Sequence, residues 1–146
     1  YMKQKDIFIE ITNLIIPEIG DFRDDTKELA SWTVENLGSK TPFHLIAFSP
    51  TYKITHLPRT PANMIESHID VVKDEGLEYV YSGNIPGHNY ENTICPNCGF
   101  KAVERYSVFL KSNNLNDDGR CPKCGTDLGI AGIEWMQIGP GSSRFF

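Results

Sequence analysis

Two nearly identical pairs of cysteines constrain this chain more than any other feature. The stretches "ICPNCGF" (94–100) and "RCPKCGT" (120–126) each place two residues between two cysteines. Residues 99 to 120, 22 in number, separate the pairs. This spacing is typical of a tetrahedral four-thiolate metal site. The glycine after each pair suits the left-handed corner of a tight knuckle. The predicted ligands are Cys95, Cys98, Cys121 and Cys124.

A closed structural zinc site is the favoured interpretation, because all four ligands come from protein and none is left for a substrate. The alternatives are a redox dithiol, a rubredoxin-like iron site, or two disulfides, which an intracellular chain does not normally form. Between the pairs, an alternating apolar segment leads to a polar turn at Asp118-Gly119, which predicts a hairpin joining the knuckles. We therefore expect a zinc ribbon over residues 85–128.

The first 84 residues alternate between strand and helix patterns. Apolar, β-branched runs predict strands at 6–17, 43–49 and 77–82. One helix is expected from a capping box at Asp25 and Glu28 to Gly38, and another from an N-cap at Thr60 to Gly76. This βαβαβ order predicts an α/β fold with three parallel strands.

Three parallel strands with two helices leave a sheet edge and apolar surface uncovered, whereas parallel sheets are normally buried on both faces. Residues 1–84 are therefore expected to be the end of a larger α/β sheet or barrel. Residues 129–146 are assigned as a C-terminal tail, whose sequence matches no motif.

Composition and charge exclude several classes of function. Hydrophobic residues make up 40% of the chain and the formal net charge is −5, typical of a globular protein without a nucleic-acid-binding face. The ribbon region 91–128 carries five basic and five acidic residues. There is no apolar run of about 20 residues and no signal-peptide core. We expect no nucleic-acid or membrane partner and a cytoplasmic location.

Candidate binding residues lie where the parallel strands end, since ligands bind at the carboxyl ends of such strands. This edge is expected to gather Asn13, Ser49–Lys53 and the loop Gly83–Asn92, which contains Asn84 and His88. The loop could instead dock the ribbon onto the sheet. The sequence contains no Ser/His/Asp context and no phosphate loop, so it shows no catalytic apparatus of its own.

Four stretches resemble the C-terminal part of one family: "IEITNLIIPEIGD", "PFHLIAFSPTYKITHLPRTP", "EGLEYVYSGNIPGHNYENTICPNCG" and "GRCPKCG". The chain resembles the radical S-adenosylmethionine enzymes of the AmmeMemoRadiSam system, homologues of pyruvate formate-lyase activating enzyme. The resemblance covers about residues 5 to 125, and "GNIPG…ENT.CPNCG" is its most specific piece.

The resemblance implies the C-terminal βαβαβ part of a partial (β/α)₆ barrel that binds a [4Fe–4S] cluster and S-adenosylmethionine. It implies reductive cleavage of S-adenosylmethionine to a 5′-deoxyadenosyl radical by the full-length enzyme. The partners implied are the missing N-terminal barrel half and a protein substrate or another AmmeMemoRadiSam component. The cofactor-binding candidates are Asn13, His44, Asn84 and His88.

The chain also departs from the family. The C-x₃-C-x₂-C cluster motif is absent, because the four cysteines are spaced as a ribbon. Thr12 and Ala47 stand where family members have arginine, and His44 matches the "PFH" histidine by letters but not by strand ends. The chain alone is therefore expected to be inactive. The alternative hypothesis is a free-standing zinc-ribbon module that binds a protein partner.

Overall fold

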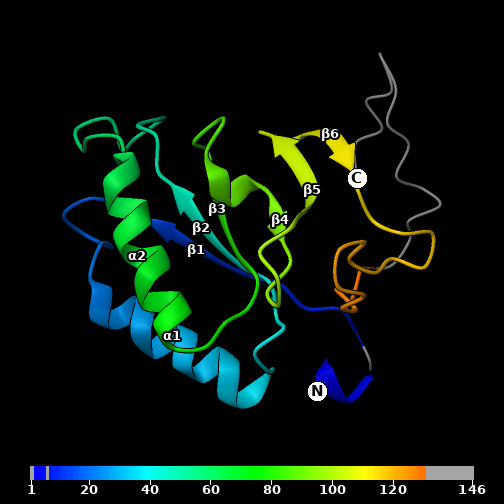
Figure 1. Ribbon diagram of the computed structural model, residues 1–146. Helices are drawn as coiled ribbons and strands as arrows, with labels where there is room; N and C mark the ends of the chain where they lie inside the picture. Colours follow the sequence, from blue (N-terminus) through cyan, green and yellow to red (C-terminus); the bar gives the residue numbers. More distant parts are fainter. Residues whose placement is uncertain (1, 6, 131–146) are drawn as a thin grey trace. The chain divides into compact units, whose positions relative to one another are not determined.

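A computed structural model describes residues 2–5 and 7–130, and it divides the chain into two compact units between Ile85 and Pro86. The first unit is mixed α/β and the second is a small antiparallel β unit (Figure 1). The predicted tail from residue 131 onward lies outside the described residues. Each unit is considered by itself below.

The first unit contains the predicted parallel sheet. After a short 3₁₀ helix, η1 (Lys3–Lys5), its elements are β1 (Ile11–Ile15), α1 (Arg23–Asn36), β2 (Phe43–Ala47), α2 (Ala62–Asp74) and β3 (Val80–Gly83). The strands pair in the order β1-β2-β3, and both pairs are parallel. The prediction of an α/β fold with three parallel strands is confirmed.

Both helices lie on the same face of this sheet (Figure 1). Asn13 of β1 donates from Nδ2 to the Thr26 hydroxyl of α1 at 3.2 Å. The same hydroxyl lies 2.8 Å from Nδ1 of His68 on α2. These bonds join the sheet to both helices through one chain of polar side chains, of which Thr26 and His68 are buried. The apolar side chains around it are buried and come from the sheet and from both helices: Ile15, Ala30, Phe43, Leu45, Ile65, Ile69 and Val72.

The opposite face of the sheet carries the alternate side chains of each strand. They are Thr12 and Leu14 of β1, His44 and Ile46 of β2, and Tyr81 and Gly83 of β3. Neither α1 nor α2 covers this face, which we call the open face. Leu14 remains 45% exposed. Gly83 leaves room for Ile46, since a Cβ added to Gly83 would lie 2.4 Å from Ile46 Cδ1.

The helices begin differently from the sequence prediction. The Asp25 capping box is wrong: α1 starts at Arg23 with Phe22 as N-cap, and Asp25 lies inside the first turn, where its charge complements the helix dipole. The N-cap of α2 is Pro61 rather than Thr60. The Thr60 hydroxyl instead donates to the Ile15 carbonyl and accepts from the Phe48 N–H, which ties the ends of β1 and β2 together.

The second unit comprises the 3₁₀ helix η2 (Asn89–Glu91) and the antiparallel strands β4 (Thr93–Ile94), β5 (Lys101–Tyr106) and β6 (Phe109–Asn113). The expected hairpin forms, but its turn lies at Ser107 and Val108, between the paired residues Tyr106 and Phe109. Asp118-Gly119 belongs to a separate small turn, in which the Gly119 N–H bonds to the Asn116 carbonyl. The predicted position of the hairpin turn is therefore wrong.

Among the described residues, no helix is long and apolar enough to cross a membrane.

Candidate metal centre

The two cysteine pairs form knuckles with the same backbone geometry. In each knuckle the N–H of the first cysteine donates to the carbonyl five residues later, Cys95 to Phe100 and Cys121 to Thr126. The glycine N–H that follows each pair donates back to the carbonyl of the first cysteine. Gly99 and Gly125 have φ of 70° and 73°, as the sequence predicted. Each knuckle thus turns two thiols to the same side.

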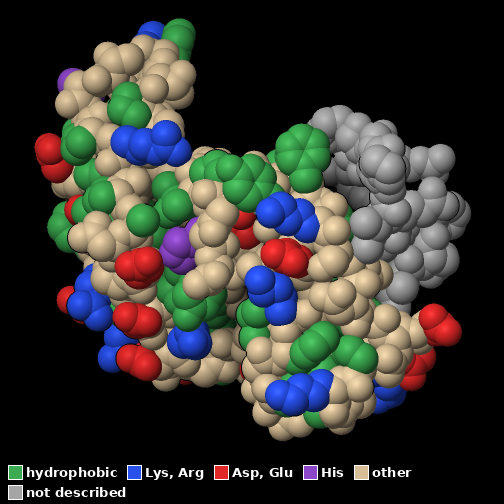
Figure 2. Space-filling view, turned by 45° about the horizontal axis from the view of Figure 1, so that its top comes forward, with side chains coloured by type: hydrophobic (Ala, Val, Ile, Leu, Met, Phe, Trp, Pro, Cys, Tyr) green, Lys and Arg blue, Asp and Glu red, His purple; other side chains and the backbone are tan. Residues whose placement is uncertain are grey.

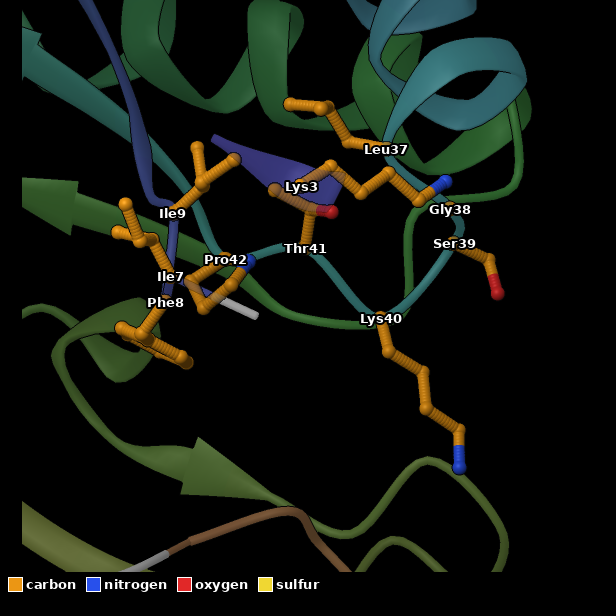
Figure 3. Close-up of a pocket in the computed structure, with 10 residues that line it drawn as sticks. All are labelled: Lys3, Ile7, Phe8, Ile9, Leu37, Gly38, Ser39, Lys40, Thr41 and Pro42. Carbon is orange, nitrogen blue, oxygen red and sulfur yellow. The ribbon is translucent and has the colours of Figure 1, made fainter. Parts of the chain in front are cut away.

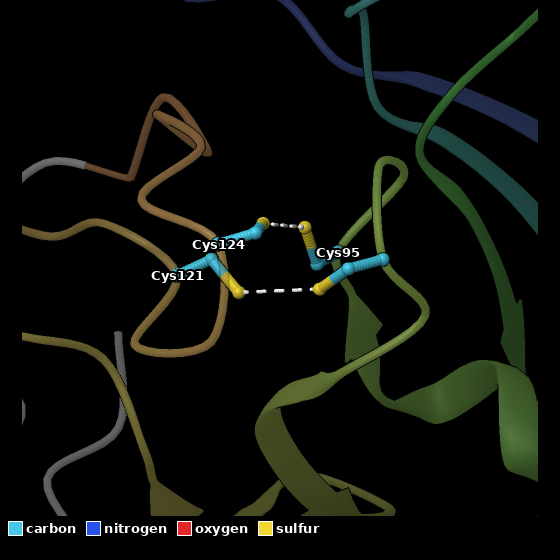
Figure 4. A group of neighbouring side chains, drawn as sticks. Cys95, Cys121 and Cys124 are labelled. Carbon is cyan, nitrogen blue, oxygen red and sulfur yellow. Dashed lines mark hydrogen bonds between the residues drawn. The ribbon is translucent and has the colours of Figure 1, made fainter.

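The four cysteine side chains point toward a common centre (Figure 4). Cys95 Sγ lies 3.6 Å from Cys124 Sγ, and Cys98 Sγ lies 3.6 Å from Cys121 Sγ. All four sulfurs lie within 4.8 Å of one another. A tetrahedron with metal–sulfur bonds of about 2.3 Å has edges of about 3.8 Å, whereas a disulfide is about 2.05 Å long. The cysteines are free thiols positioned to bind a metal ion.

The surroundings favour unequal ionisation of the thiols. Hydrogen bonds from the Thr126 hydroxyl and N–H lower the pKa of Cys124 to about 5. For Cys98, the Phe100 backbone bond lowers the pKa, but desolvation and the neighbouring thiols outweigh it and raise the pKa to about 12. Thiolates this close repel one another, so the four thiols do not all ionise without a cation. A divalent cation removes this repulsion, since it binds thiolates and displaces their protons.

The core beneath the knuckles is small. Cys95 and Cys121 are buried with Ala102 and Leu128, and a few half-buried apolar side chains pack against them. A core of this size supplies little hydrophobic stabilisation, so small domains of this kind usually need a metal or disulfides to fold.

A second polar network holds the segment before the first knuckle, and sequence reasoning missed it. The Glu91 carboxylate is 7% exposed and accepts the N–H groups of Gly87 and Ser107 at 2.9 Å each. The neighbouring Asn92 accepts the Arg105 N–H through Oδ1 at 2.8 Å. The "ENT" part of the specific sequence motif therefore fixes the β5–β6 hairpin. The available signal was an acidic residue four positions before the first cysteine of a knuckle.

The structure places the four predicted cofactor contacts in different surroundings. Asn13 lies in the middle of β1 on the helix-covered face, bonded to Thr26. Asn84 follows β3 with φ 63° and donates to the Ala47 carbonyl, which joins the ends of β2 and β3. His88 belongs to the second unit, where it caps η2 and stacks on Tyr90. Within the first unit, Asn13 and Asn84 thus bond to different elements, the Thr26 hydroxyl of α1 and the end of β2.

His44, the fourth, lies on the open face near the start of β2. Its Nε2 atom is 3.4 Å from the Glu10 carboxylate, and its ring stacks on Tyr81 with 5.1 Å between centroids. His44 is thus positioned by neighbours from the segment before β1 and from β3. Its place near the strand start separates it from Asn84, which follows the other end of the sheet.

A shallow pocket of about 470 Å³ lies at the start of the strands (Figure 3). Its lining is mainly Ile7, Phe8, Ile9 and the loop Leu37–Pro42, with Lys3. Two of the polar side chains there bond within the chain: Lys3 donates to the Asn36 carbonyl, and Ser39 donates to Glu78. Lys40 extends away from the other lining side chains in Figure 3.

Charged side chains are mixed on the face shown in Figure 2, where basic and acidic groups alternate instead of forming a stripe. Arg120 of the ribbon lies 3.4 Å from Asp118 and 3.7 Å from Asp127.

Fold and site together define an α/β unit with a parallel sheet, followed by a unit that carries four cysteines positioned to bind a metal ion. No protein-family model and no solved structure matches the chain. The uncharacterized protein MJ0808 of Methanocaldococcus jannaschii is 43% identical to it over 129 residues, which is 88% of this chain and 39% of that protein. The chain thus spans about two-fifths of the length of this relative.

Proposed function

We propose that the chain is the C-terminal part of a radical S-adenosylmethionine enzyme of the AmmeMemoRadiSam system, with a structural zinc ribbon attached. The supporting observation is the winding of the first unit. Its three parallel strands follow one another in sequence order, and both helices lie on one face. Doubly wound folds place helices on both faces, whereas barrels place them all outside.

In this proposal the open face is the interior of a partial (β/α)₆ barrel. His44 faces that interior, held by the Glu10 carboxylate and the Tyr81 ring. Asn84 bridges the carboxyl ends of two strands, where a barrel binds its ligands. The cluster and S-adenosylmethionine, which supply the radical chemistry, would be held mainly by the preceding half. The length of MJ0808 is compatible with such a half.

Zinc is the proposed occupant of the cysteine site. Four thiolates in a tetrahedral arrangement favour zinc or iron, and a closed set of four protein ligands is typical of structural zinc. The symmetric knuckles and the small core support a fastening role. The cysteines would hold the ribbon, while the reaction belongs to the barrel.

The decisive experiment is 5′-deoxyadenosine formation by the longer protein that contains these residues. After anaerobic iron–sulfur reconstitution and reduction, it should cleave S-adenosylmethionine, and residues 1–146 alone should not. His44→Ala should lower the rate about 10-fold or more through misplacement of the bound cofactor, whereas His56→Ala, in the loop after β2, should leave it unchanged. No cleavage by a cluster-loaded longer protein would refute the proposal.

A free-standing zinc-ribbon interaction module is the second candidate. The observation that favours it is the tip of the β5–β6 hairpin, where Tyr106, Val108 and Phe109 are exposed. Exposed apolar side chains at a loop tip are common in binding surfaces. The mass of the protein in cells separates the two candidates: a 16.5 kDa product favours the module, and a polypeptide about twice that size or larger favours the enzyme.

A further inference from the structure

We propose that one flank of the first unit docks a preceding strand–helix unit of the same polypeptide. This flank, the β1 edge surface, consists of the outer backbone groups of Thr12 and Leu14 and the side chains of Leu29 and Trp32. The inference rests on the proposed function because its occupant belongs to the longer protein. It adds the residues that receive this occupant.

The outer backbone N–H and C=O groups of β1 can form hydrogen bonds with a further parallel strand. Ile11 donates its N–H to Pro42, and the Ile15 carbonyl accepts from Phe48, so these residues face β2. Successive residues of a strand point their N–H and C=O groups to opposite sides, so Thr12 and Leu14 point away from β2. No described strand pairs with that side.

The edge also lacks the features that usually prevent pairing. Exposed edge strands are commonly protected by charged residues, proline or bulges. The sequence of β1, "ITNLI", contains no charge and no proline, and its register with β2 is regular over all five residues. An edge of this kind is suited to a partner strand rather than to solvent.

The helix above this edge carries matching apolar side chains. Lys27 lies on the flank of α1 that meets α2, because its Nζ is 3.8 Å from the Glu75 carboxylate at the end of α2. At about 100° per residue, Leu29 and Trp32 lie about 140–160° around the axis from Lys27. They therefore occupy the flank away from α2, and Trp32 is 49% exposed. A further helix can pack there.

Strand edge and helix flank together require a partner that supplies both elements. Consecutive βα units lie side by side in sequence order, so the unit before β1 belongs on this flank. The matched segment covers only 39% of MJ0808, which leaves a long stretch of that protein outside it. We therefore assign the β1 edge surface to a preceding strand–helix unit rather than to a second copy of this chain.

Residue-resolved amide hydrogen exchange tests this assignment in residues 1–146 and in the longer protein. The Thr12 and Leu14 amides should exchange quickly in the short chain and about 100-fold or more slowly in the longer protein. The Asn13 amide, which faces β2, should be protected in both and serves as the internal control. Trp32→Gln should destabilise the longer protein more than residues 1–146, because about half of the Trp32 side chain is still exposed in the short chain, whereas the control change Glu28→Gln should affect both equally.

Several results would overturn the assignment. The first is rapid exchange of the Thr12 and Leu14 amides in the longer protein. The second is protection of these amides in the short chain that rises with protein concentration, which would indicate pairing with a second copy. The third is the absence of any longer polypeptide in cells. The test is separate from the enzymatic one. A longer protein that protects these amides but does not cleave S-adenosylmethionine retains the docking surface and loses the proposed function.

Discussion

At the residue scale, the buried side chain of Glu91 fixes the position of the hairpin turn in the second unit. Glu91 accepts two backbone N–H groups from segments on either side of it, Gly87 and Ser107, and no other described side chain holds these two groups. Its carboxylate therefore links the entry of the second unit to the hairpin turn. This bond also explains why the turn forms at Ser107, whose φ of 55° is unusual for serine.

Glu91→Gln should destabilise the second unit by about 1–3 kcal/mol, because an amide nitrogen cannot accept and one hydrogen bond to the buried, charged carboxylate is lost. Urea unfolding followed by hairpin amide signals measures this change. Glu104→Gln is the control, since Glu104 makes only an exposed pair with Lys101 at 3.6 Å and should cost less than about 1 kcal/mol. Equal losses in both variants would contradict the role of Glu91.

His68 is the buried side chain from which we expect a pH dependence of the first unit. The side chain is 1% exposed. The Thr26 hydroxyl accepts from Asn13 and lies 2.8 Å from His68 Nδ1, a contact in which the neutral ring can accept the hydroxyl proton. Burial is the main cause that lowers the pKa of His68, with Arg23 acting in the same direction and the backbone and charge of Asp21 opposing it.

The stability of the first unit should therefore fall as the pH drops below about 6.5. The unfolded chain then binds a proton at His68 that the folded chain resists, so stability is full above the unfolded pKa and is lost as the pH falls toward the folded pKa. Urea unfolding between pH 8 and pH 5 should show a steeper loss in the wild type than in His68→Gln. Identical pH profiles would show that His68 is not the cause.

At the scale of elements, the packing of β2 against β3 on the open face depends on a missing side chain. Gly83→Ala should cost about 1–3 kcal/mol through overpacking, because its Cβ would meet Ile46 Cδ1. Ile46→Val removes that atom and should recover most of the loss in the double variant. A double-mutant cycle with no coupling between the two positions would contradict this contact.

The sequence predicted the elements better than their ends. Alternating apolar patterns and the left-handed glycines at 38 and 76 located both helices and all three parallel strands. The true N-cap of α1 could not be predicted, because Phe22 has no side chain that signals a cap. The turn at Ser107 depends on a carboxylate 16 residues earlier, and local propensity instead favoured Asp118-Gly119.

The candidate metal site could be predicted from the sequence, whereas the surroundings of the candidate cofactor contacts could not. The four cysteines are close in sequence and carry their own turn signals, so spacing alone located the cluster. Which face of a strand a residue occupies depends on the whole sheet. Asn13 was therefore expected beside a cofactor but lies against Thr26 on the helix face, and the neighbours of His44 come from two distant segments.

For the whole molecule, the central claim is that a metal fastens the second unit while the first unit is held by its own apolar core. The thiols of the second unit surround a common point, and few apolar side chains support them. The first unit has a buried layer between its sheet and helices and contains none of the cysteines. Removal of the metal should therefore act on the second unit alone.

Amide hydrogen exchange of the purified chain before and after chelation is the most direct measurement of this claim. Chelation, or Cys98→Ser, should remove protection at the knuckle amides and across residues 91–128, because metal binding supplies the folding free energy of such small units. The amides of the parallel sheet should remain protected. Protection that persists across residues 91–128 after metal removal, or that is lost equally from the sheet, would contradict the account.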